Sequence, residues 1–168
     1  MADIAVGDVV TAARINDKAG TIIGYGERPT ASTAFTTTEQ PIMRIDSIPV
    51  VNGRQYEVVM TPTVIASSVA ADLVETRIRV AVAATATITS THLGSLIETA
   101  NSSSGNQKIN GATWLYTPTS TGNLSLLVAG IRLGGTGSCA IGHTSTAYML
   151  RIIVKDLGTA VSDTGVDL

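Results

Sequence analysis

Residues able to do covalent chemistry are few in this sequence. The chain has two histidines, His92 and His143, and one cysteine, Cys139. Cys139 and His143 lie four residues apart in a glycine-rich stretch, and a histidine beside a cysteine can activate its thiolate. The sequence favours a plainer interpretation, in which a small buried cysteine is followed by a loop histidine. His92 opens an expected strand and is interpreted as a surface residue.

The acidic residues point to neither hydrolysis nor metal binding. General acid–base or nucleophilic catalysis needs paired carboxylates or a nucleophile with a base, whereas the acids here are scattered along the chain. Two histidines without a neighbouring acidic cluster also fail as a transition-metal site. We therefore expect no enzymatic activity, no metal and no cofactor.

One glycine-rich segment has part of the composition of a phosphate-binding loop, Gly134-Gly135-Thr136-Gly137-Ser138. A phosphate loop opens a helix and ends on lysine followed by serine or threonine. Here Cys139-Ala140-Ile141 follows, in strand-like surroundings. The segment is therefore predicted to be a turn between strands.

Two aromatic residues, Trp114 and Tyr116, share one face of an expected strand. Rings at this spacing can stack on sugars. In a chain with only 4% aromatic residues, however, rings more often serve as the bulkiest fillers of the core. Core packing is favoured, and glycan stacking by Trp114 and Tyr116 is kept as the alternative.

The elements that would position these residues are β-strands, because alternation of period two dominates the chain from residue 31 onward. Leu73–Ala83 is the clearest case, with one apolar face and a second face that begins with Glu75, Arg77 and Arg79. Further strands are expected at Ala31–Thr38, Ile42–Ile48, Gln55–Ile65, Leu93–Thr99, Thr113–Thr117, Leu124–Leu133 and Ala147–Lys155. About eight strands separated by turn formers predict an all-β, antiparallel two-sheet sandwich of jelly-roll type.

The first 30 residues differ from the rest, so the chain is divided into a docking arm, residues 1–30, and a sandwich domain, residues 31–168. Thr11 can cap a short helix over Ala12–Lys18 that ends at Gly20. A helix this short is ordered only by contacts with other groups. The apolar positions of the docking arm are predicted to contact a partner protein: Ile4, Val6, Val9, Val10, Ile15 and Ile22.

Composition favours self-association. Charged residues make up 14% of the chain, below the roughly 25% of ordinary soluble domains, and the mean hydropathy is +0.30. The strand Leu124–Leu133 is apolar on both faces, as expected of a strand covered twice. We predict a homo-oligomer, most simply a homotrimer, with these residues at its interface: Leu124, Leu126, Leu127, Val128 and Ile131.

Charge and hydropathy exclude other partners. The net charge is −2 and basic residues are not clustered, so nucleic acid is not expected to bind. No apolar run reaches the 18–20 or so residues needed to span a bilayer, so membrane insertion is not expected. The N-terminus, with Asp3 and Asp8, does not match a signal peptide. Synthesis in the cytoplasm, without a signal peptide, is expected.

Several segments resemble small structural proteins of actinobacterial tailed phages. The opening Val10–Asn16 resembles their T-A-x-R-[LI]-N pattern. The similarity continues through Met43–Val50, Gly53–Tyr56, Val74–Val80, Lys155–Gly158 and Asp163–Leu168. The resemblance implies a virion protein of the capsid-surface (decoration) or minor tail, fibre type, often a trimeric sandwich with an N-terminal anchor. It implies no catalytic residues.

Together these observations predict a non-enzymatic structural protein on the virion exterior, which docks on phage capsid or tail proteins. The alternative is a receptor- or glycan-binding module of a phage tail tip, with a host surface glycan as its ligand.

Overall fold

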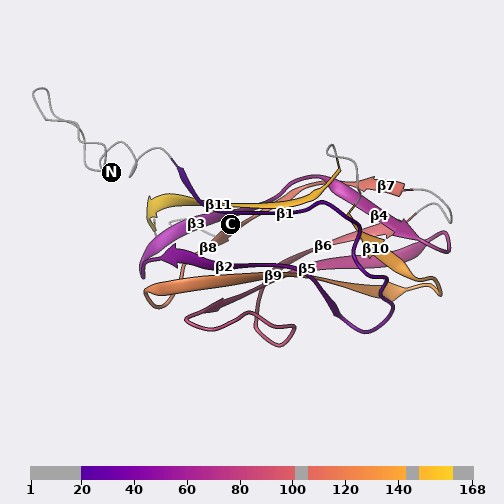
Figure 1. Cartoon of the computed structure of the whole chain (residues 1–168), viewed down its shortest axis with the longest axis horizontal. Coiled ribbons are helices and arrows are strands. Elements are labelled where there is room, and N and C mark those ends of the chain that lie inside the picture. Colours follow the sequence, from indigo (N-terminus) through magenta and orange to yellow (C-terminus); the bar gives the residue numbers. More distant parts are fainter. Residues whose placement is uncertain (1–19, 101–105, 143–147, 161–168) are drawn as a thin grey trace, which may run out of the picture.

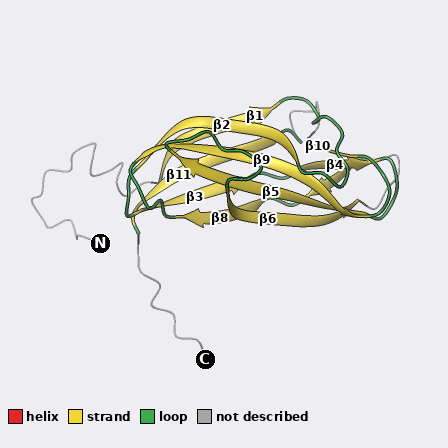
Figure 2. Cartoon of the chain, turned by 90° about the horizontal axis from the view of Figure 1, so that it is seen from below, coloured by secondary structure: helices red, strands yellow, loops and turns green. Residues whose placement is uncertain are grey.

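The structure, a computed structural model, describes residues 20–100, 106–142 and 148–160, and in these residues it is all-β. Eleven strands and no helix occur there (Figures 1 and 2). The strands are β1 (Thr21–Arg28), β2 (Gln40–Val50), β3 (Arg54–Met60), β4 (Thr63–Ser67), β5 (Asp72–Val82), β6 (Thr91–Ala100), β7 (Asn106–Ile109), β8 (Ala112–Tyr116), β9 (Gly122–Gly134), β10 (Cys139–Ile141) and β11 (Leu150–Thr159). Within this part of the chain, no helix is long and apolar enough to cross a membrane.

Two four-stranded antiparallel sheets pack face to face, one in the order β1-β11-β3-β8 and the other in the order β2-β9-β5-β6 (Figure 1). The short strands β4, β7 and β10 form a third sheet at one end. When the eight strands of the two large sheets are numbered in chain order, these sheets read 1-8-3-6 and 2-7-4-5. This is the jelly-roll order. The predicted sandwich is therefore confirmed.

The core lies between the two large sheets and follows the predicted alternation. Val74, Ile78 and Val80 of β5 point inward and are at most 2% exposed, as are Tyr56 and Met60 of β3. Burying each such side chain contributes about 1.5–3 kcal/mol before the entropy of ordering is subtracted. The period-two pattern thus identified the inward face of both strands correctly.

The single strand expected over Gln55–Ile65 is two strands, β3 and β4, which belong to different sheets. Pro62 lies between them and has no N–H to donate to a neighbouring strand. The strand expected over Ala31–Thr38 is wrong as well. In that segment Phe35 alone forms an isolated bridge, with Cys139, while the threonines around it are exposed.

Strands β1, β7 and β10 were not expected. Gly24 and Gly26 are of a residue type typical of turns, yet both lie within β1, which pairs with β11. A Cβ on Gly26 would lie 2.6 Å from Ile45 Cγ1, so glycine allows β1 to approach β2 closely. Residues 21–28, assigned to the arm, are therefore a strand of the sandwich. The expected helix Ala12–Lys18 lies outside the described residues.

Candidate functional site

The outer face of the β1-β11-β3-β8 sheet has an apolar row across its middle. The strand register aligns Tyr25 with Ile153 and Ile153 with Val59. Their neighbours Ile152, Val154 and Val58 are buried, so this row points away from the core. Tyr25 is 53% exposed, whereas Ile153 and Val59 are half-buried. We call this outer surface, with the two rows beside it, the β1–β8 face.

One neighbouring row is apolar at its ends and charged in its middle. It runs from Ile22 through Lys155 and Glu57 to Leu115. Ile22 is 57% exposed and Leu115 is 56% exposed. Between them, Lys155 Nζ lies 2.7 Å from Glu57 Oε2. The ion pair leaves this row electrically neutral.

The other neighbouring row is polar and also neutral. Arg151 Nε lies 3.2 Å from Glu27 Oε2, and the Tyr25 hydroxyl donates a 2.5 Å hydrogen bond to the same oxygen. The hydrogen bond from Tyr25, followed by that from Arg151, lowers the pKa of Glu27, and bonding to this carboxylate raises the pKa of Tyr25. An apolar centre beside paired charges is the usual make-up of a protein interface.

The predicted docking residues are only partly covered by the structure. Ile4, Val6, Val9, Val10 and Ile15 lie outside the described residues, whereas Ile22 is part of β1. Ile22 was predicted to belong to an arm and instead projects from the sandwich, on the β1–β8 face. Ile22 is therefore the one predicted docking residue whose position the structure describes.

The predicted oligomer interface on β9 is wrong for most of its residues. Leu124, Leu126 and Val128 are 0% exposed and belong to the core between the sheets, and Leu127 is 3% exposed. Only Ile131 is half-buried. A side chain without exposed surface makes no contact with a second copy. The sequence showed correctly that β9 is covered on both faces, but the second cover belongs to the same chain.

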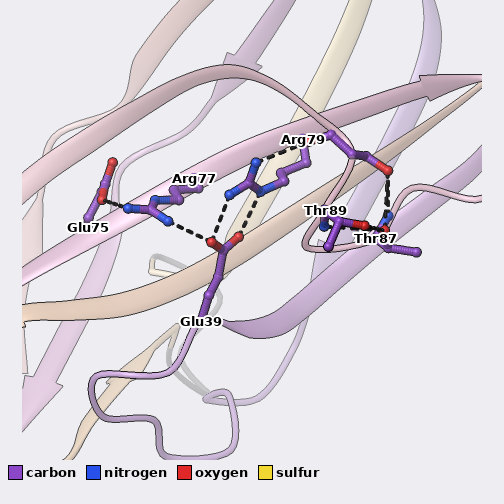
Figure 3. A network of polar contacts seen from close by, with 7 residues as sticks. Glu39, Glu75, Arg77, Arg79, Thr87 and Thr89 are labelled. Carbon is purple, nitrogen blue, oxygen red and sulfur yellow. Dashed lines mark hydrogen bonds and ion pairs between the residues drawn. The ribbon is translucent and has the colours of Figure 1, made fainter.

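That second cover includes a network of charged side chains from β5 and from the residue before β2 (Figure 3). The register places Arg79 beside Leu127 and Arg77 beside Ala129 on the outer side of the sheet. Arg79 binds Glu39 through two nitrogens, Nε and Nη2, each 2.8 Å from a carboxylate oxygen. Arginine stems cover apolar surface while their charged ends stay paired.

Glu39 holds both arginines of this network. Arg77 Nη1 lies 2.7 Å from Glu39 Oε2, and Arg77 Nη2 lies 2.6 Å from Glu75 Oε2. Hydrogen bonding from Arg79, opposed by burial and aided by Arg77, lowers the pKa of Glu39. All four side chains are at most 23% exposed. No sequence pattern points to Glu39, because it lies 38 residues before Arg77 and outside any strand.

The two predicted stacking residues, Trp114 and Tyr116, point into the sandwich. Both are half-buried and pack against the core, and burial raises the pKa of Tyr116. A Cβ on Gly94 of β6 would overlap the Trp114 indole nitrogen, so the ring lies directly on the Gly94 backbone. The rings form no exposed platform. Their role as core fillers, which the sequence favoured, is what the structure supports.

The glycine-rich loop after β9 binds a carboxylate of its own chain. Asp72 Oδ1 accepts hydrogen bonds from the backbone N–H groups of Thr136 (2.9 Å) and Gly137 (3.2 Å), and Oδ2 accepts one from the Ser67 hydroxyl. Asp72 is 0% exposed. The Ser67 bond is the main cause of its lowered pKa, working against burial. The loop interpretation is confirmed, and these amides are occupied by the protein itself.

The reactive residue types have no catalytic arrangement in the part of the chain that the structure describes. Cys139 is 0% exposed, and burial raises the pKa of its thiol, which disfavours the thiolate. His143 lies outside the described residues, and His92 is exposed on β6, as expected. Among the described residues, no three His, Cys, Asp or Glu side chains are grouped to hold a metal ion.

A polar hollow of about 440 Å³ lies beside the start of β9. It is lined by Asp46, Ser47, Ala83, Ala84, Thr85, Asn123 and Ser125. Asp46 already accepts hydrogen bonds from Ser125 (2.5 Å) and from Arg44 (2.9 Å), which together lower its pKa. No aromatic ring lines the hollow. Asp46, the one carboxylate that lines the hollow, has its hydrogen-bond partners within the protein.

Comparison with known proteins assigns no family to this chain. No protein-family model matches the chain, and no curated protein matches it. Among solved structures, it is similar to the CBM22-1 xylan-binding domain of Xyn10C from Paenibacillus barcinonensis. The two are 11% identical, with a TM-score of 0.35, over 85% of this chain and 99% of the other. At that level, the similarity carries no argument about ligand or activity.

Proposed function

We propose that this chain is a non-enzymatic structural protein on the exterior of a tailed phage, where it self-associates and docks on capsid or tail proteins. The observation that supports docking is the β1–β8 face. It exposes Ile22, Tyr25 and Leu115 on a rigid sheet while its charges are paired. A surface with this make-up loses little when it is covered, because no unpaired charge has to be desolvated.

The energetics of docking favour this face. Ile22, Tyr25 and Leu115 are 53–57% exposed, so covering each contributes about half of the 1.5–3 kcal/mol of complete burial, roughly 0.8–1.5 kcal/mol, before ordering costs are subtracted. The three side chains lie on paired strands, so the backbone that carries them is already ordered before docking. Docking therefore does not incur the roughly 1–2 kcal/mol per residue that ordering a flexible backbone costs. A flexible arm alone would bear that cost for every residue.

The phage assignment comes from the resemblance of the sequence segments, and the fold is compatible with it. A particle-surface protein needs a stable unit, an interaction surface and no active site. The segment before β1 contains the remaining predicted docking residues and leads into the β1–β8 face at Ile22. In this proposal, both the segment and the face take part in docking.

The alternative, a glycan-binding module, has lost its main support. It rested on Trp114 and Tyr116 as adjacent exposed rings, and both rings face the sandwich interior. The structural role is therefore the function that the geometry supports better.

Substitution on the β1–β8 face tests the proposal. Tyr25→Lys places a charge on the most exposed residue of the apolar row, at its β1 end, and is expected to reduce cosedimentation of the purified chain with phage particles at least tenfold. Ile88→Lys is the matched control, because Ile88 is an exposed apolar residue (38%) in the β5–β6 loop. Equal loss in both variants, or no loss in Tyr25→Lys, would argue against docking through this face.

A further inference from the structure

Among the strands that the structure describes, β6 forms an edge of its sheet and pairs with β5 alone. The seven residues Gly94–Ala100 pair with Asp72–Ile78 without a break. The opposite side of β6 therefore presents a regular row of backbone N–H and C=O groups. Such a row is complementary to an extended strand and to no other backbone shape.

The other long edges of the sandwich have features that prevent strand pairing, whereas β6 has few. Strand β2 contains Pro41 and Pro49 and two register shifts, and β1 has a shift beside Gly24. Strand β8 has only five residues. Strand β6 contains no proline, lysine or arginine, and its one register shift precedes Gly94. Proline, lysine and bulges are the usual protection of edge strands.

Apolar side chains gather on the same side of the sandwich. Figure 2 shows β6 and β8 along one long side. Leu93 and Leu96 of β6 and Trp114 and Tyr116 of β8 are half-buried there, packed against the core. Ile97 projects outward from β6 and is 51% exposed. Ile97 is therefore an exposed apolar side chain that a strand paired with β6 would cover.

We infer that two copies of this chain pair through β6, antiparallel, about a two-fold axis at Ile97. This inference rests on the self-association in the proposed function and names its contact. Ile97 is the midpoint of Gly94–Ala100. A two-fold axis at Ile97 therefore pairs all seven residues of this segment with the same segment of the second copy. The two sheets join into one of eight strands, and Ile97 packs against Ile97 of the second copy.

The charges of the strand agree with this register. Glu98 is the one carboxylate on β6. With the axis at Ile97, it stands opposite Leu96 of the second copy, so no two carboxylates are directly opposed. Ser95 stands opposite Thr99, a pair of hydroxyl side chains compatible with an antiparallel sheet. This two-fold dimer differs from the trimer that was predicted from the sequence. The residues of β9 predicted to form the trimer interface are mostly buried inside the protomer.

Cysteine cross-linking of the full chain tests this geometry directly. Ile97→Cys places two thiols across the axis, at the roughly 5 Å Cα separation that a disulfide accepts. Mild oxidation is expected to convert most of this variant to a covalent dimer. Ser95→Cys is the control on the same strand, because its two copies lie about 13 Å apart in this register. Leu115→Cys controls for random collision, because Leu115 is exposed to a similar extent (56%).

A mixture of Ser95→Cys and Thr99→Cys chains is expected to form a mixed dimer, although neither variant cross-links with itself. Light scattering of the unmodified chain is expected to give twice the chain mass of 17.3 kDa. Equal cross-linking of all variants, none in Ile97→Cys, or a trimeric mass would overturn the inference. These outcomes leave docking of the β1–β8 face untouched, since none of the measurements uses particles.

Discussion

Replacing Gly137 by alanine places a methyl group where the structure holds the Asp72 carboxylate. The added Cβ would overlap Asp72 Oδ2 and would lie 2.7 Å from Ser67 Oγ and 2.9 Å from the Val69 nitrogen. The backbone at Gly137 is not in the left-handed region, so alanine is strained there by contact alone. The carboxylate must move, and Asp72 is buried where water does not replace lost partners.

The size of the effect follows from the hydrogen bonds that this movement breaks. A hydrogen bond to a charged group contributes about 1.5–3 kcal/mol. Loss of one or two of the bonds to Asp72 is therefore expected to lower the free energy of unfolding by about 2–5 kcal/mol. Total stabilities of domains are about 5–15 kcal/mol, so the variant is expected to be strongly destabilised.

Urea unfolding monitored by circular dichroism measures this difference, with Gly134→Ala as the matched control. Gly134 lies three residues earlier, and a Cβ there would meet only Leu73 Cβ, at an ordinary 3.7 Å. The control is expected to change the free energy of unfolding by less than about 1 kcal/mol. If Gly137→Ala unfolded at the same urea concentration as Gly134→Ala, the account of the Asp72 site would be refuted.

Three further predictions concern Asp72, Gly94 and the N-terminal segment. Because the pKa of folded Asp72 is lowered, its ionisation stabilises the fold above the unfolded-state pKa of about 4, and this contribution is lost as pH falls through the lowered pKa. The gap in unfolding free energy between wild type and Asp72→Asn should therefore shrink below about pH 4; a gap independent of pH would contradict this. Gly94→Ala is expected to cost about 1–3 kcal/mol and to shift the fluorescence of Trp114, the one tryptophan of the chain, whereas an unchanged spectrum would place the ring elsewhere. Removing residues 1–19, which leaves β1 intact, is expected to preserve the circular dichroism spectrum and to abolish cosedimentation with particles; binding at wild-type strength would exclude a docking role for this segment.

The sandwich could be predicted from sequence because alternation reports burial directly. In β5, each buried apolar residue alternates with a residue of the outer face, and the predicted inward face is the observed one. Strand β1 carried a weaker signal, since Gly24 and Gly26 resemble turn residues until the closeness of β2 is known. The sequence alone does not distinguish a glycine that is needed where two strands approach closely from a glycine that is needed in a turn.

The site was harder to predict, because its contacts join distant segments. The apolar row Tyr25, Ile153 and Val59 depends on a register between strands more than 90 residues apart in sequence. The second cover of β9 was attributed to another subunit, since no local pattern indicates that Glu39 reaches Arg77 and Arg79. Low charge content indicated self-association, but only the strand order shows that β6 is an open edge.

Electron microscopy of virus particles purified from the source of this chain tests the proposed virion role most directly. The account predicts copies of the sandwich on the outer surface of the capsid or tail, with Ile22, Tyr25 and Leu115 of the β1–β8 face against the neighbouring particle protein. A purified particle that lacks the chain, or one in which the β1–β8 face is turned to solvent on every copy, would contradict it.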